Sequence, residues 1–259
     1  MTGSVDHPPA ISPGRAKRPS RTYEAIREAI GLFQTVFGIK LIEGRLAWEF
    51  YFYDYQRRQR IVSMSRVLAA IRPYLAARFA PDENLPYFMF SIDIDLGIDA
   101  GPAQEARPLE VIHAYIGNPG STVSSGIAYA LQAGSITLEN FYFFFDAASQ
   151  LTEAAEKIAS SPHFDATRLP IDAVLLPELR NCRTICVANK QMCDCVYFSG
   201  VDVDQLSWFL VRLGYPAPLV DFVAVNRANL DHLLFDVGFD YRIENDGLRV
   251  LKSGYYGVF

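Results

Sequence analysis

The sequence predicts an α+β fold in which a closed, ten-stranded antiparallel β-barrel is built from repeated helix–strand–strand–helix (αββα) units, with the helices packed outside. Two observations predict it. Segments with strand-like alternation occur in five pairs joined by turn residues, and amphipathic helical segments lie between the pairs. Closure pairs both edges of so long a sheet and gives it an enclosed inner face. An open α+β sheet with one solvated face is the alternative.

The beginning of the chain differs in composition from the rest. It contains prolines, serines and a run of basic residues, Arg15, Lys17, Arg18 and Arg21. We predict a disordered basic leader over residues 1–21, with an arm that docks by electrostatic attraction as the alternative. Residues 22–259 contain no candidate linker, so we expect a single domain.

The first helix and hairpin follow the leader. Apolar residues at helical spacing predict a helix over residues 22–36, with Thr22 as its N-cap. Two strands are predicted at 38–43 and 46–55, with a turn at Glu43 and Gly44. The second strand alternates strictly, which favours a strand over a helix. One of its faces carries Trp48, Phe50 and Phe52, and the other carries Glu49, Tyr51, Tyr53 and Tyr55.

The same pattern recurs along the remaining chain. Further helices are predicted over residues 61–79, 148–160, 203–213 and 217–232. Further strand pairs are predicted at 86–96 with 109–117, 125–132 with 135–145, 182–190 with 193–199, and 233–243 with 248–258. The chain has 14 Tyr beside 18 Phe, and on several strands the tyrosines share a face with charged residues. This division predicts a Phe-rich core under the helices and a Tyr-lined lumen that holds a ligand.

Bulk properties exclude several function classes. A net charge of −5 argues against general nucleic-acid binding. No apolar run is long enough to span a bilayer, and the leader lacks the pattern of a signal peptide. We therefore expect a soluble, cytoplasmic protein, monomeric, without nucleic-acid or membrane partners.

Four cysteines, Cys182, Cys186, Cys193 and Cys195, occupy a short stretch of the chain. Their spacing lacks the C-x2-C pairs of structural zinc sites. We interpret them as reduced, buried side chains that act as small hydrophobes. A metal or redox site and a reactive thiol are the alternatives.

Five strand motifs resemble, in order, those of the ABBA-type (αββα-barrel) aromatic prenyltransferases of the soluble bacterial branch. The motifs are L-A-W-E-F-Y at 46–51, S-I-D-I-D at 91–95, E-N-F-Y-F at 139–143, C-D-C-V-Y-F at 193–198 and V-L-K-S-G-Y-Y-G at 250–257. The resemblance implies a barrel of five αββα units that transfers a prenyl group from an allylic diphosphate, dimethylallyl or geranyl, to an aromatic small molecule.

Such chemistry implies three groups of residues. Cationic and amide donors hold the departing diphosphate, and the candidates are Lys40, Asn140, Lys190 and Lys252. Aromatic walls shield the carbocation, and the acceptor pocket would be formed by Tyr51, Tyr142, Tyr197, Tyr256 and His113. A carboxylate, Glu49 or Asp93, orients or deprotonates the acceptor. No cofactor is required, and no metal ligands are assigned; Mg²⁺ could bind at Asp93 without being essential.

The chain also departs from the family pattern at cationic positions. Glu49 and Cys195 stand where the family often has arginine, and Val111 stands where a lysine is expected. Each lost charge-assisted contact removes about 1.5–3 kcal/mol. Either Lys190, Arg242 or Arg249 compensates, or the ligand is not a diphosphate.

Several residues have a structural interpretation beside the functional one. Glu49 could form a salt bridge with Lys40 across the hairpin, Asp93 and Asp95 could be solvated at a barrel rim, and His113 could be a hydrogen-bonded core histidine. Two alternative functions follow. One is a barrel that binds a small hydrophobic or aromatic ligand without chemistry. The other is a cyclase or isomerase that uses Glu49 and Asp93 as an acid–base pair.

Overall fold

A computed structural model describes residues 19–31, 35–54, 62–95, 107–118, 124–245 and 247–258. The predicted leader therefore lies outside the described residues up to position 18. Residues 19–21 belong to the first helix, α1 (Pro19–Ile30). Within the described residues no helix is both long enough and apolar enough to cross a bilayer.

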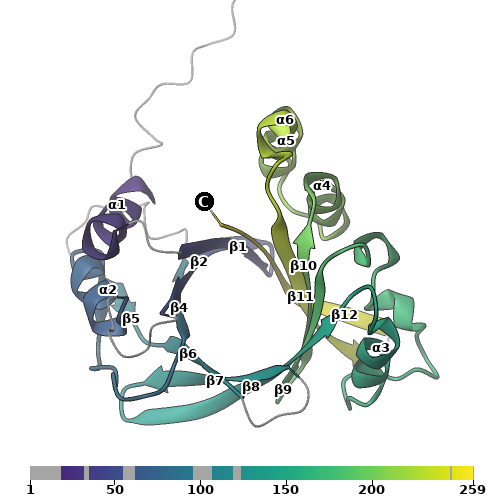
Figure 1. The fold of residues 1–259 in the computed structure, drawn as a ribbon, viewed down its shortest axis with the longest axis horizontal. Helices are drawn as coiled ribbons and strands as arrows, with labels where there is room; N and C mark the ends of the chain where they lie inside the picture. Colours follow the sequence, from purple (N-terminus) through teal and green to yellow (C-terminus); the bar gives the residue numbers. More distant parts are fainter. Residues whose placement is uncertain are drawn as a thin grey trace, which may run out of the picture.

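Ten strands close into an antiparallel barrel (Figure 1). In order around the barrel they are β1 (Thr35–Ile42), β12 (Gly247–Val258), β11 (Phe235–Glu244), β10 (Asp194–Val201), β9 (Thr184–Lys190), β8 (Ser135–Asp146), β7 (Ser125–Gln132), β6 (Ile112–Gly117), β4 (Met89–Asp95) and β2 (Arg45–Tyr53). The first strand closes the circle, because β1 pairs with β2 on one side and with β12 on the other. The predicted closed barrel is confirmed, and the open sheet is excluded.

Tight turns join the hairpins where the sequence predicts them. Glu43 and Gly44 have φ values of 48° and 75°, so the turn between β1 and β2 uses the left-handed region that glycine adopts without strain. Gly134, with φ of 77°, plays the same part between β7 and β8. These turns fix the register of each hairpin and with it the side chains that face inward.

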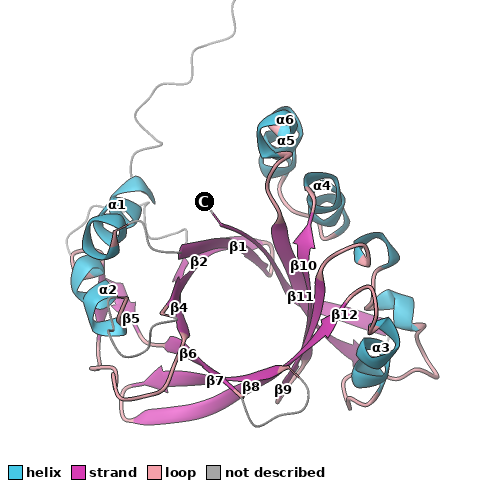
Figure 2. Cartoon of the chain, in the orientation of Figure 1, coloured by secondary structure: helices cyan, strands magenta, loops and turns pink. Residues whose placement is uncertain are grey.

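The helices lie outside the barrel in two groups (Figures 1 and 2). Helices α1 and α2 (Met64–Ile71) cover β2 and β4, where Phe50 and Phe52 join a buried cluster with Ile26 and Val67. The other group covers β9 to β11 with a second cluster. Its members are α3 (Leu151–Ala159), α4 (Val203–Arg212), α5 (Ala217–Val225), α6 (Arg227–Leu230) and two single turns at Ile171–Ala173 and Pro177–Leu179.

The predicted helix over 217–232 is two helices, α5 and α6, which meet at Asn226, and two other predicted helices have different bounds for identifiable reasons. Helix α1 ends at Ile30 because Gly31, with φ of 73°, turns the chain while its N–H still bonds to Arg27. Thr22 therefore lies inside α1 rather than capping it, and the end of the predicted segment belongs to β1. Helix α2 is much shorter than predicted because Pro73, which lacks an N–H, follows its last turn.

A small parallel sheet was not predicted. The residues after α2 form β3 (Leu75–Ala77), which pairs with β5 (Arg107–Leu109). Between β6 and β7 the described residues contain no helix. The repeated αββα unit therefore stays a prediction.

Candidate functional site

The inner face of the barrel lines two cavities. The first, called the polar cavity, has a volume of about 390 Å³, and its lining includes Lys40 of β1 and Lys252 of β12. The other, called the second cavity, has a volume of about 510 Å³, and its lining includes Val36 of β1 and Tyr256 of β12. The two cavities thus extend toward opposite ends of the strands. Both volumes are in the range of small-molecule sites.

Five tyrosines form a belt of rings between the two cavities. Successive ring centroids lie 5.9 Å, 5.8 Å, 5.5 Å and 6.4 Å apart. In that order the members of this tyrosine belt are Tyr142, Tyr115, Tyr51, Tyr256 and Tyr197. Burial raises the pKa of all five phenols well above the usual value, so they are neutral at physiological pH.

Inward-facing glycines make room for two of these rings. A Cβ at Gly38 would lie 2.2 Å from Cδ1 of Tyr256, and one at Gly254 would lie 2.6 Å from the hydroxyl of the same tyrosine. A Cβ at Gly238 would lie 2.3 Å from Cδ1 of Tyr197. The rings therefore lie directly against the backbone of β1, β11 and β12. Any residue larger than glycine at these three positions would overlap a ring.

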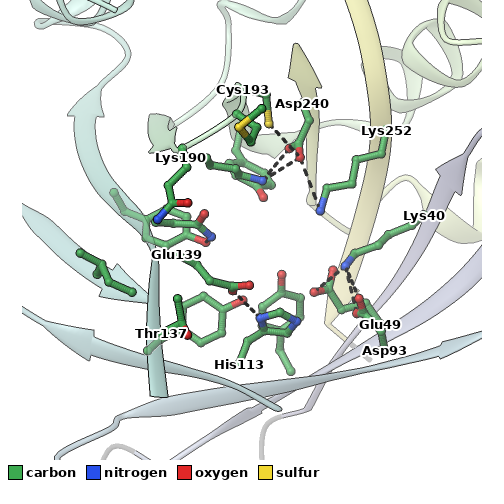
Figure 3. A pocket seen from close by; sticks show the side chains of 18 residues that line it. Lys40, Glu49, Asp93, His113, Thr137, Glu139, Lys190, Cys193, Asp240 and Lys252 are labelled. Carbon is green, nitrogen blue, oxygen red and sulfur yellow. Dashed lines mark hydrogen bonds and ion pairs between the residues drawn. The ribbon is translucent and has the colours of Figure 1, made fainter. Parts of the chain in front are cut away.

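Lys40 binds two carboxylates at one side of the polar cavity (Figure 3). Its Nζ lies 2.8 Å from Glu49 and 2.9 Å from Asp93. The hydroxyl of Tyr256 donates to the other oxygen of Glu49 at 3.0 Å. Burial opposes the ionisation of Asp93, but the adjacent Lys40 outweighs it and lowers the pKa of that carboxyl. Glu49 thus forms the cross-hairpin salt bridge that was the structural interpretation of its position.

A second ion cluster is centred on Asp240. Both oxygens of this carboxylate accept hydrogen bonds from Lys190 at 2.8 Å, and Lys252 lies 3.5 Å away. Burial opposes its ionisation, but Lys190 and Lys252 outweigh that effect and lower the pKa of Asp240. Lys40, Lys190 and Lys252 point into the same cavity from different sides (Figure 3).

A β-bulge brings an unpredicted carboxylate into the polar cavity. In the pairing of β7 with β8, Ala128 is opposite Asn140 and Tyr129 is opposite Leu138, so Glu139 is the extra residue. Strict alternation would turn Glu139 away from the lumen. Instead its Oε2 lies 2.6 Å from Nδ1 of His113, and burial is outweighed by this contact, which lowers the pKa of Glu139.

The structure brings together the residues that the sequence singles out. The polar cavity is lined by Lys40, Glu49, Tyr51, Asp93, His113, Asn140, Tyr142, Lys190, Tyr197 and Lys252. Tyr256 lies in the belt and lines the second cavity instead. Arg242 and Arg249 line neither of these cavities, because both bind Glu244 near the last turn, at 2.6 Å and 3.1 Å. Of the three suggested replacement cations, Lys190 alone lies in the lumen.

The lumen residues that were not selected from the sequence include Tyr115, Asp236, Glu139 and Asp240. A signal existed for three of them. Tyr115 lies two residues after His113 on β6 and therefore shares its face. On β11 the lumen face follows a period of two through Asp236, Gly238 and Asp240, the same alternation that identifies the tyrosine face of β2. For Glu139 the alternation is misleading because of the bulge.

Charge balance limits what the polar cavity can bind. Three lysines and His113 face four carboxylates, Glu49, Asp93, Glu139 and Asp240. An anionic ligand must therefore compete with these carboxylates for the ammonium groups. Among the described residues, no three histidine, cysteine, aspartate or glutamate side chains are grouped so as to hold a metal ion.

The four cysteines are free, and all but the partly buried Cys182 are buried. Burial raises the pKa of Cys182 to about 11 and that of Cys195 well above its usual value. These thiols are therefore protonated near neutral pH and are poor nucleophiles. Cys193 lies at the rim of the polar cavity, with its Sγ 3.8 Å from Asp240.

No protein-family model matches this chain, and no curated protein matches it. The assignment of a function therefore depends on the geometry of the lumen.

Proposed function

We propose that the protein is an aromatic prenyltransferase of the ABBA type, which joins an allylic diphosphate to an aromatic acceptor inside the barrel. One observation carries the proposal. A belt of five neutral phenol rings separates a cavity lined by three lysines from a more apolar cavity. An anionic leaving group, an allyl cation and an aromatic ring require that succession of environments. We also propose that the barrel is built from repeated αββα units, as the same family resemblance implies.

The diphosphate would occupy the polar cavity. Lys190 and Lys252 both contact Asp240 in this cavity. The side-chain amide of Asn140 also lines the cavity, where it donates a hydrogen bond to the Tyr142 hydroxyl at 2.8 Å. Each charge-assisted hydrogen bond to a phosphoryl oxygen contributes about 1.5–3 kcal/mol. In ionisation, the allylic C–O bond breaks and its electron pair leaves with the diphosphate, so the ammonium groups stabilise the charge that develops.

The tyrosine belt would protect the allyl cation. A ring face attracts a cation, and a wall of rings excludes the water that would trap it. The raised pKa values of the belt keep the phenols neutral over the physiological range, so the belt does not itself become an anionic nucleophile.

A carboxylate would complete the reaction. When a ring carbon of the acceptor bonds to the allyl carbon, the ring must lose a proton to regain aromaticity. Glu49 is buried, contacts Lys40 and Tyr256, and lies next to the belt. It is therefore better placed than Asp93 to accept the proton that the ring loses. Asp93, which is 44% exposed, lies farther toward the rim. The lowered pKa of Asp93 argues against its use as the acid of an acid–base pair.

The direct test is release of pyrophosphate from dimethylallyl or geranyl diphosphate in the presence of a panel of phenols, naphthols and indoles, with Mg²⁺ and with EDTA. We expect prenylated product, and a loss of at least 100-fold in turnover with Lys190→Met. Lys157→Met on the outer helix α3, a lysine stacked on Phe143, is the matched control and should leave turnover unchanged. No product with any acceptor, together with no pyrophosphate binding by calorimetry, would refute the proposal.

A second candidate function is a barrel that binds a small apolar or aromatic ligand without chemistry. The observation that favours it is the pairing of each lumen lysine with a carboxylate, which leaves no cation free to receive a diphosphate among the residues that line the polar cavity. In that case Lys252→Ala would leave ligand affinity unchanged, whereas a prenyltransferase would lose diphosphate affinity.

A further inference from the structure

The second cavity differs from the polar cavity in its charge. Aromatic, apolar and hydroxyl side chains line it, and among its lining residues Asp236 is the single charged one. Its wall includes all five rings of the tyrosine belt and Phe144. A ligand in this cavity therefore meets one carboxylate in a largely aromatic and apolar wall.

Asp236 lies on the lumen face of β11, opposite Tyr256 of β12 and Ser199 of β10. One of its oxygens, Oδ1, accepts a hydrogen bond from the Ser199 hydroxyl at 2.6 Å and another from the N–H of Gly200 at 3.1 Å. Within the described part of the chain, no lysine, arginine or histidine forms an ion pair with this carboxylate, and no residue there donates a hydrogen bond to its other oxygen, Oδ2. Burial raises the pKa of Asp236 in spite of these two hydrogen bonds.

In the polar cavity, by contrast, each carboxylate contacts a basic side chain. There Glu49 and Asp93 share Lys40, Glu139 contacts His113, and Asp240 binds Lys190. A partly buried carboxylate without a cation is costly unless a ligand completes the pair. Functional sites are where such unpaired groups concentrate.

We propose that the second cavity binds a small molecule with a protonated amino group, whose ammonium pairs with Asp236 while its apolar part packs on the tyrosine belt. An anionic group would be repelled by Asp236, and a neutral hydroxyl would gain a hydrogen bond without the charge pairing. Ring faces such as those of Tyr197 and Tyr256 add cation–π attraction for the ammonium. The proposed prenyl transfer would place its aromatic acceptor in this same cavity, but the pairing of an ammonium with Asp236 does not require that reaction and can be tested without a diphosphate.

Calorimetry with three indoles of nearly equal size tests it, without any diphosphate present. Tryptamine carries an ammonium, tryptophol a neutral hydroxyl and indole-3-propionate a carboxylate. For the unaltered protein we expect tryptamine to bind at least tenfold more tightly than tryptophol, and indole-3-propionate to bind most weakly. Asp236→Asn keeps the acceptor for Ser199 and removes the charge, so the two affinities should then agree within threefold. Asp221→Asn, at an exposed position of α5, is the matched control and should change neither.

Equal affinity of the unaltered protein for tryptamine and tryptophol would overturn the proposal. So would a tenfold preference for tryptamine that survives in folded Asp236→Asn. If that variant does not fold, Asp236→Ser provides the second test, because it also removes the charge and keeps a polar side chain beside Ser199. Loss of the preference for tryptamine over tryptophol would support the site, and survival of that preference would overturn it.

Discussion

Replacement of Asp240 is expected to change anion affinity and protein stability in opposite directions. Asp240→Asn removes the negative charge that lies 2.8 Å from Lys190 and 3.5 Å from Lys252. A phosphoryl oxygen that bridged both ammonium groups would lie roughly 6 Å from this carboxylate. At that distance and an effective dielectric constant of about 20, each unit of ligand charge is opposed by roughly 3 kcal/mol.

We therefore expect Asp240→Asn to bind inorganic pyrophosphate at least tenfold more tightly than the unaltered protein does, as measured by calorimetry. The same change leaves the largely buried Lys190 without its ionic partner, which should lower the free energy of unfolding by about 3–5 kcal/mol. Because the variant is expected to be less stable, the pyrophosphate-dependent rise in Tm provides a second readout. Asp221→Asn controls for net charge.

Folded Asp240→Asn that binds pyrophosphate no more tightly than the unaltered protein would contradict this expectation. That result would mean that Lys190 and Lys252 serve only to neutralise a buried carboxylate. It would then favour the ligand-binding barrel over the transferase.

Three further predictions concern stability. Tyr256→Phe should lower the free energy of unfolding by about 1.5–3 kcal/mol, because Glu49 loses a buried donor; chemical denaturation measures it, and no loss would contradict the contact. Gly238→Ala should lower the free energy of unfolding by about 1–3 kcal/mol, because its Cβ would overlap Tyr197. Gly126→Ala, whose Cβ would lie 3.5 Å from its nearest neighbour, should lower it by less than about 1 kcal/mol in the same assay. Asp236→Asn should raise Tm at pH 7.5 but not near pH 4: a carboxyl with a raised folded pKa loses its proton first in the unfolded state, so it destabilises the native protein as pH rises. An equal gain in Tm at both pH values would contradict that sign.

The sequence allowed much of the scaffold to be predicted, because strand alternation and turn residues are local signals. The opposite faces of β2, with Phe50 under the helices and Tyr51 in the lumen, follow from a period of two and the closed topology. Gly44 marks the first turn for an equally local reason.

What could not be predicted depends on contacts between distant strands. The pairing of Lys190 with Asp240 joins β9 to β11, which are not neighbours in the barrel, and no local pattern reveals it. The inward position of Glu139 depends on a bulge that breaks the period of two. Three lysines selected from the sequence thus line the polar cavity, and the Lys40–Glu49 salt bridge was foreseen, but Glu139 and Asp240 were not selected.

The position of the tyrosine belt has a consequence for the order of binding in the proposed transfer. Four of its rings line both cavities, and the cavities extend toward opposite ends of the strands. In a site with a single mouth, the ligand that entered first could leave only after the second. With one cavity on each side of the belt, we expect either substrate to bind first, and each to exchange while the other stays bound.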